Sequence, residues 1–379
     1  MEIELRVPAD FTVDDGFSPW HADDQVTFLL DWQIVEHTVL LGDAWVIQRF
    51  LTAIFKTPRP RLVWSEKALE TLKTSPGAVA LLACAIHLDR VINVLADGST
   101  LSPQRQVALQ QSLAAHRLKP NWFEATDSVI CSGNKLRGWH KDFYSTAGQL
   151  RPRDEIARIL NSLIESKVTG LPSEELVLKW KDSLASVIYE LFENTHIHAR
   201  FDYDRIALAS DNIRLVTVRL VTASTGGNPT KIKTNKSIEC LEISVIDSGV
   251  GFFGSRLKRP LFPSDELKYE WENVRMCLDK HIDDEPLQHT HRGLGLYEVL
   301  RALHFLNGAI QVRSGRIFGY RSFFPFDHRQ QMEAIDSKKR PGMPKGRLLD
   351  YNEPYRPSPT ANSEVRGVAV RTLVPLSWE

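Results

Sequence analysis

The sequence lacks the features that mark secreted, membrane-spanning and disulfide-stabilised proteins. Its 379 residues include only 4 cysteines and no CxxC pair, so we expect a reduced protein without structural disulfides. The longest apolar run, Ala78–Ile86, is far shorter than the ~20 residues that a membrane helix needs. The first residues include acids and no apolar segment of a signal peptide. These absences predict a cytoplasmic protein with no membrane partner.

Net charge is also absent, because 47 lysines and arginines balance 47 aspartates and glutamates. This balance does not indicate nucleic-acid binding, although it leaves a local basic patch open. The chain is long enough for two domains. Residues 1–150 mix strand-like and helical segments without a repeat, and we interpret them as a mixed α/β domain of unassigned fold that recognises a signal or a partner. Residues 151–379 carry the more informative patterns.

One amphipathic helix, expected at about Ser173–Arg200, has polar residues where its buried side should be apolar. Its apolar stripe runs from Leu184 with spacings i, i+3, i+4, i+7 and i+8. At ~100° per residue, Glu190, Asn194 and His198 lie at or inside the edge of this stripe, one turn apart. Burying a carboxylate and an amide costs several kcal/mol unless each finds a partner. Two interpretations are open: the three residues line a polar cavity, or they are edge residues that reach water.

Two glycine motifs follow, and each is a weak signal by itself. Asp247-x-Gly249-x-Gly251 comes directly after an apolar strand, where glycines let a ligand approach the backbone closely. The same residues are also common in ordinary turns. The second motif leads into an apolar helix and consists of Gly293, Leu294, Gly295 and Leu296. Backbone N–H groups at such a helix start favour phosphate, although a tight turn before a packed helix would have the same sequence.

In this order, the three motifs resemble those of the GHKL superfamily, the ATP-binding domains with the Bergerat fold. Gyrase B, sensor histidine kinases and anti-sigma-factor serine kinases belong to it. The resemblance covers about residues 151–379. The His-Ala ending of the helix motif is most similar to the histidine-kinase and anti-sigma branch, whereas Glu190 four residues before Asn194 is shared with the ATPase and serine-kinase branches. The resemblance implies a C-terminal α/β sandwich in which helices cover a mixed sheet. It also implies a lid at residues 252–292, and it leaves residues 327–366 as a polar insertion before the last strand.

The resemblance further implies a role for each motif residue. Asn194 would coordinate a Mg²⁺ ion that bridges the phosphates, since Mg²⁺ takes oxygen ligands. Glu190 would be the general base that acts toward the γ-phosphate. Asp247 would accept a hydrogen bond from the adenine amino group, and Gly249 and Gly251 would let the base lie close to the backbone.

The second glycine motif would bind the phosphates. Gly293 and Gly295 would offer N–H groups, with Arg292 or His291 adding positive charge. His198, Leu294 and Leu296 complete the predicted ATP-binding set.

Three functions are left open for the whole chain. The first is slow hydrolysis of Mg-ATP, with lid closure as a switch. The second is a serine/threonine or histidine protein kinase, and the third is a nucleotide-sensing adaptor without turnover. His116 and His140 are poor candidates for a phosphoacceptor histidine, which disfavours a sensor histidine kinase. In each case we expect ATP and Mg²⁺ as ligands and a protein partner bound through the N-terminal domain, and a homodimer stays open.

Overall fold

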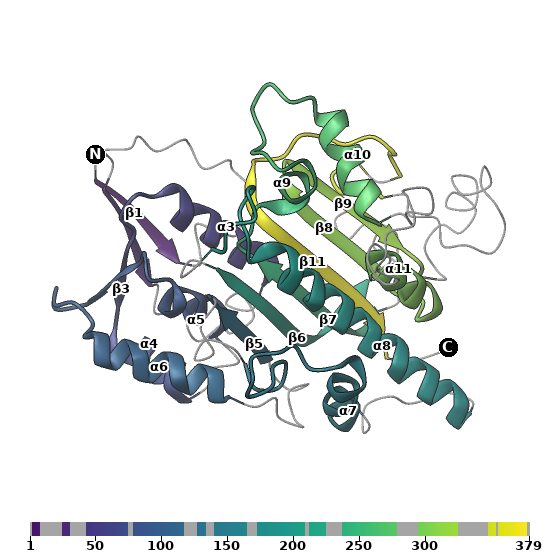
Figure 1. Ribbon diagram of the computed structural model, residues 1–379, viewed down its shortest axis with the longest axis horizontal. Coiled ribbons are helices and arrows are strands. Elements are labelled where there is room, and N and C mark those ends of the chain that lie inside the picture. The colour runs from purple at the N-terminus through teal and green to yellow at the C-terminus, as the bar shows by residue number, and fades with distance from the viewer. Residues whose placement is uncertain are drawn as a thin grey trace.

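Two β-sheets organise the chain. The computed structural model describes residues 2–7, 25–30, 43–74, 79–116, 127–133, 140–164, 173–208, 212–224, 237–278, 295–324, 348–353 and 355–376. Within these ranges a seven-stranded antiparallel sheet and a four-stranded parallel sheet are combined with helices (Figure 1). The predicted α/β class is therefore confirmed. None of the helices in these ranges is long and apolar enough to cross a membrane.

The larger sheet has the strand order β10-β9-β8-β11-β7-β6-β5. Its strands are β5 (Asp127–Ser132), β6 (Ile213–Ser224), β7 (Ser237–Asp247), β8 (Ala309–Gly315), β9 (Ile317–Ser322), β10 (Leu349–Asp350) and β11 (Val365–Pro375). Every neighbouring pair is antiparallel, so the prediction of a mixed sheet is wrong for the described strands. For one pair the reason is local: β8 turns directly into β9 at Gly315 and Arg316, and a tight hairpin can join only antiparallel strands.

Five helices cover the face of this sheet that faces the viewer in Figure 1. They are α7 (Arg153–Ile164), α8 (Glu174–Asn194), α9 (Gly251–Leu257), α10 (Leu267–Leu278) and α11 (Gly295–Phe305). Ser173 caps the first turn of α8, since its hydroxyl accepts a hydrogen bond from the N–H of Leu176 at 3.3 Å. The predicted apolar stripe of α8, from Leu184 to Phe192, is buried against β7 and α11. This confirms the amphipathic helix.

The N-terminal region covers the opposite face of the same sheet. It contains α3 (Ala44–Lys56), α4 (Glu66–Thr74), α5 (Ala80–His87), α6 (Pro103–Ala115) and the parallel strands β1 (Glu2–Val7), β2 (Gln25–Leu30), β3 (Arg61–Trp64) and β4 (Ile92–Leu95). Phe28, Phe50 and Trp64 from this region share one core with Ile246 and Ala369 of the large sheet. The predicted boundary at residue 150 therefore does not divide the core, and β5, which precedes it, is an edge strand of the large sheet.

The predicted polar insertion at residues 327–366 is only partly described, and its described part is not uniformly polar. Leu348 and Leu349 are buried, and Leu349 pairs with Tyr320 of β9 through β10. These apolar side chains extend the sheet by one short strand, which is why this part of the segment is not a free loop. Residues 325–347 and 354 lie outside the described residues.

Candidate functional site

The end of α8 changes helical geometry where the predicted residues lie. After Asn194 the chain continues as a π-helical turn, η5 (Thr195–Ala199). A π turn holds more residues than an α turn and is frequent at functional sites. His198 lies in this turn and is exposed, as expected for an edge residue that reaches water, and it also lines the cavity described below. Glu190 and Asn194 precede this turn and are half-buried.

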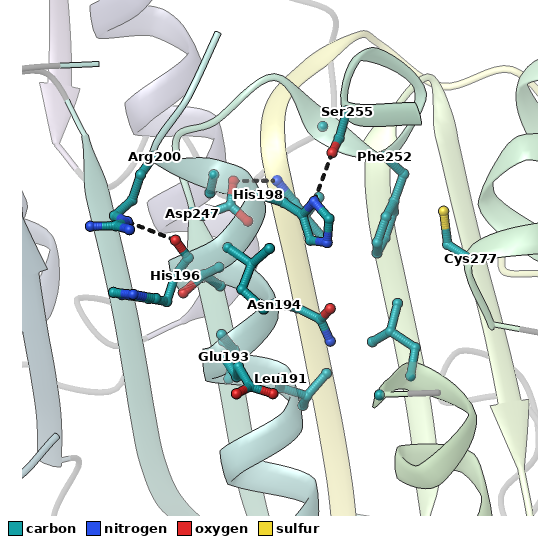
Figure 2. Close-up of a pocket in the computed structure, with 18 of the residues that line it drawn as sticks. Leu191, Glu193, Asn194, His196, His198, Arg200, Asp247, Phe252, Ser255 and Cys277 are labelled. Carbon is teal, nitrogen blue, oxygen red and sulfur yellow. Dashed lines mark hydrogen bonds between the residues drawn. The ribbon is translucent and has the colours of Figure 1, made fainter. Parts of the chain in front are cut away.

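A cavity of about 650 Å³ lies against this helix end (Figure 2). Its walls come from α8, η5, β7, β11 and the first turns of α9 and α11. The volume falls within the range of small-molecule sites. The predicted residues that line it are Glu190, Asn194, His198, Asp247, Gly251, Gly295 and Leu296. Residues from three separate motifs are thus brought to one site.

At two glycines the motifs pack so closely that a side chain would not fit. A Cβ atom on Gly295 would lie 2.9 Å from Oε2 of Glu190 and 3.1 Å from Nδ2 of Asn194. A Cβ atom on Gly249 would lie 2.8 Å from Cα of Ala199. Each glycine therefore permits a close approach between its own segment and the end of the helix.

The floor of the cavity, which we define as Asp247 with Ser248 and Gly249 behind it, is tightly held. Of these three, Asp247 lines the cavity, whereas Ser248 and the predicted residue Gly249 do not. Asp247 is only 6% exposed. Its Oδ1 accepts hydrogen bonds from the N–H of Gly249 at 2.8 Å and from the N–H of Val368 at 3.3 Å. Both bonds go to Oδ1, which leaves Oδ2 as the oxygen that can accept a bond from a ligand. Burial raises the pKa of Asp247 to about 6, although the two N–H groups and the guanidinium groups of Arg366 and Arg214 act in the opposite direction.

The open end of the cavity, which we define as Glu190, Asn194 and Gly295, has a different character. Nδ2 of Asn194 donates to the backbone oxygen of Glu190 at 2.7 Å, which leaves its Oδ1 as the amide atom that can accept a bond or bind a cation. Partial burial and the negative charge of Glu193 raise the pKa of Glu190, while Arg153 lowers it. A carboxylate with a raised pKa beside an amide oxygen is suited to proton transfer and to binding a cation.

The two histidines of the π turn have different surroundings. Nδ1 of His198 lies 3.2 Å from Oγ of Ser255, at an exposed position. Nδ1 of His196 lies 2.8 Å from the hydroxyl of Tyr144, and burial together with nearby arginines lowers the pKa of His196 to about 3. His196 is therefore neutral at physiological pH, which leaves it no charge to offer an anionic ligand.

Several lining residues are absent from the sequence-based set. Phe252 and Ser255 follow the first glycine motif on α9, and Val368 and Val370 come from β11. Figure 2 shows the ring of Phe252 directed into the space between His198 and Cys277. The alternating residues after Gly367 could have indicated the β11 contribution, but its position beside β7 depends on long-range pairing.

Some predicted residues cannot be placed. Arg292, Gly293 and Leu294 lie outside the described residues, as do residues 279–292 of the predicted lid. The described part of that lid forms α9 and α10. Within the described ranges, no group of three or more His, Cys, Asp or Glu side chains is arranged to hold a metal ion. Asn194 contributes an amide oxygen at the cavity, a ligand type that could hold a Mg²⁺ ion.

The chain was also compared with known proteins. No family model, curated protein or solved structure matches the chain.

Proposed function

We propose that the cavity binds Mg-ATP in the manner of the GHKL domains and that the chain hydrolyses it slowly. The observation that carries this proposal is the meeting of three sequence motifs around one cavity of about 650 Å³. A buried carboxylate lies at one end, and an amide and a second carboxylate lie at the other. A nucleotide requires this order of groups, from the base to the phosphates.

Recognition of adenine depends on Asp247. Its Oδ2 accepts a hydrogen bond from the exocyclic amino group, and it is largely ionised at pH 7 because its pKa is about 6. Guanine presents a carbonyl oxygen at the equivalent position and is repelled. Phe252, Val368 and Val370 supply apolar surface for the faces of the base and the ribose.

Reaction at the phosphates depends on Glu190. As a water oxygen attacks the γ-phosphorus, the Glu190 carboxylate takes up the proton and the bond to the ADP oxygen breaks. The raised pKa of Glu190 makes it a stronger base than an ordinary glutamate. Oδ1 of Asn194 would hold Mg²⁺, which neutralises phosphate charge.

Calorimetric titration with Mg-ATP and a phosphate-release assay test this proposal together. We expect Asn194→Ala to abolish binding, because the cation loses its protein ligand. Glu190→Gln should keep affinity within about threefold and lower turnover by at least 10²-fold, the usual contribution of a general base. Glu266→Gln is the control and should leave both binding and turnover unchanged, since Glu266 loses the same charge at an exposed position that does not line the cavity. Unchanged ATP affinity in Asn194→Ala would contradict the proposal.

A kinase is the second candidate, and one observation favours it. Glu190 is half-buried at the open end and not fully enclosed, so the hydroxyl group of a partner protein is an alternative acceptor to water. Transfer of labelled γ-phosphate to a co-purified protein would support the kinase, and release of free phosphate would support the hydrolase. Binding without either product would leave the nucleotide-sensing adaptor.

A further inference from the structure

We propose that helix α3 of the N-terminal region positions the floor of the cavity, with Arg366 as the positioning residue between them. The inference rests on the proposed nucleotide site for its functional meaning. Its structural basis is a continuous path from α3 to Asp247.

The first step of this path is a set of hydrogen bonds from α3 to the start of β11. The N–H of Arg366 donates to Oγ1 of Thr52 at 2.9 Å. Nε2 of Gln48 donates to the backbone oxygen of Arg313 at 3.2 Å and of Arg366 at 3.4 Å. Thr52 is 1% exposed, and Gln48 is fully buried.

The bonds to the N–H and the backbone oxygen of Arg366 satisfy groups that lie in an irregular part of the sheet. The pairing of β11 with β8 shifts register between Val365 and Val368. Such a bulge takes residues out of the ladder, and buried backbone groups then need other partners. Side chains of α3 are those partners, so the conformation of this bulge depends on the position of α3.

The second step is the side chain of Arg366, which joins α3 to the floor. Its guanidinium lies 4.1 Å from the ring centroid of Phe55 on α3. Its Nε donates to the backbone oxygen of Ser248 at 2.8 Å. One side chain thus contacts both the helix and the segment between Asp247 and Gly249.

The third step places the bulge directly on Asp247. A Cβ atom on Gly367 would lie 1.9 Å from the backbone oxygen of Asp247, so these segments pack backbone to backbone. The next residue, Val368, donates its N–H to Oδ1 of Asp247. A displacement of α3 would therefore shift three features together. These are the Val368 N–H that donates to Asp247, the contact between Arg366 and Ser248, and the positive charge of Arg366 near Asp247.

The path has a consequence for regulation. Coupling between two sites acts equally in both directions. A signal or partner that displaces α3 would weaken ligand binding at the floor, and a ligand bound there would hold α3 more tightly. The N-terminal region thereby has a direct route to the cavity.

Paired variants of the full chain test the inference. Thr52→Val removes the acceptor for the Arg366 N–H at nearly constant volume, whereas Thr52→Ser keeps the hydroxyl. Arg366→Ala removes the link to Ser248. Arg90→Ala is its control, because Arg90 packs over the same Phe55 ring, 4.7 Å from its centroid.

The measurements are the affinities for Mg-ATP and Mg-GTP and the hydrogen exchange of the Gly249 and Val368 amides without nucleotide. We expect Arg366→Ala to weaken ATP binding at least tenfold and to reduce the preference over GTP. Thr52→Val should weaken ATP binding at least threefold and speed exchange at both amides about tenfold. Thr52→Ser and Arg90→Ala should stay within twofold of the wild type.

Each result has a distinct meaning. If the wild type binds ATP and both Arg366→Ala and Thr52→Val keep its affinity and base preference, the inference is wrong and the proposed function stands. If the wild type does not bind ATP, the proposed function is wrong, and the exchange measurement decides the structural part. Unchanged exchange in Thr52→Val would then overturn that part as well.

Discussion

The two ends of the cavity are built in different ways. At the floor, Asp247 is buried, and two backbone N–H groups donate to one of its oxygens. Gly249 and Gly367 let neighbouring backbone segments pack closely there, because a Cβ at either position would clash. At the open end, Glu190 and Asn194 are half-buried side chains on a helix terminus. The floor thus depends on backbone fit, which suits recognition, whereas the open end depends on side chains that solvent can reach, which suits reaction.

The pKa of the carboxyl group is raised at both ends by the same main cause, but the neighbouring charges and hydrogen bonds act differently. Burial is the largest cause in each case. At Asp247 it is opposed by hydrogen bonds and by Arg366, whereas at Glu190 it is reinforced by the negative charges of Glu193 and Glu298. A carboxylate that is stabilised by donors can keep its charge to bind a ligand, and one beside other carboxylates takes up a proton more readily.

Gly367→Ala should break the floor with the largest effect on stability. Gly367 has φ of +71°, and an added Cβ would lie 1.9 Å from the backbone oxygen of Asp247. We expect the free energy of unfolding to fall by roughly 3 kcal/mol or more, the range in which overpacking and backbone strain combine. Urea denaturation measures it.

The matched control for this substitution is Gly98→Ala. Gly98 also has a positive φ, of +86°, but nothing lies within 4 Å of its would-be Cβ. Its replacement should cost only the left-handed strain of about 1 kcal/mol. Equal losses at the two glycines would mean that the contact with Asp247 contributes nothing beyond the backbone conformation.

Asp247→Asn should break recognition at the floor and leave the open end intact. An amide in place of the carboxylate can present a donor to the adenine amino group, so we expect ATP affinity to fall about ten- to a hundredfold, as for a lost bond to a charged group. The preference for ATP over GTP should fall with it. Retained affinity and preference would show that this carboxylate does not contact the base.

The same variant has an effect on stability that depends on pH. The pKa of Asp247 is about 6 in the folded protein and 3.8 ordinarily, so the folded state binds more protons between these values. Stability without ligand therefore falls as pH rises from about 4 to 6. In Asp247→Asn, the loss of unfolding free energy between pH 4 and 6 should be smaller by on the order of 2 kcal/mol. Asp265→Asn is a control with the opposite pH dependence. A hydrogen bond from Arg259 lowers the pKa of Asp265 to about 2, so the contribution of Asp265 to stability is lost as pH falls.

The residues that the sequence identified correctly belong to patterns with a local cause. The stripe from Leu184 to Phe192 follows from helical periodicity, and burial confirms it. Asp247 stands at the end of β7 because an apolar run ends there. Local periodicity marked Glu190 and Asn194 as unusual on their helix, but their selection together with Asp247 depended on the order of the three motifs and on the GHKL resemblance. All three residues line the cavity.

The features that the sequence did not reveal depend on contacts between distant segments. Val368 and Val370 reach the cavity because β11 pairs between β7 and β8. Thr52 accepts a hydrogen bond from the N–H of Arg366, which lies 314 residues later in the chain. No sequence pattern near Asp247 therefore indicates a contact with α3. The π turn that contains His198 is a further case, because neither helix propensity nor spacing predicts such a turn.

His198→Ala should have the smallest effect and should sharpen the boundary between the two ends. His198 lies between them, is exposed, and has Oγ of Ser255 as a partner at 3.2 Å. An exposed hydrogen bond of this kind contributes about 0.5 kcal/mol or less, so we expect ATP affinity to change less than threefold and turnover to stay near the wild-type value. Calorimetry on His198→Ala, Ser255→Ala and the double variant measures their coupling. A loss above tenfold in His198→Ala would place this side chain against the phosphates and would extend the open end of the cavity beyond Asn194 into the π turn.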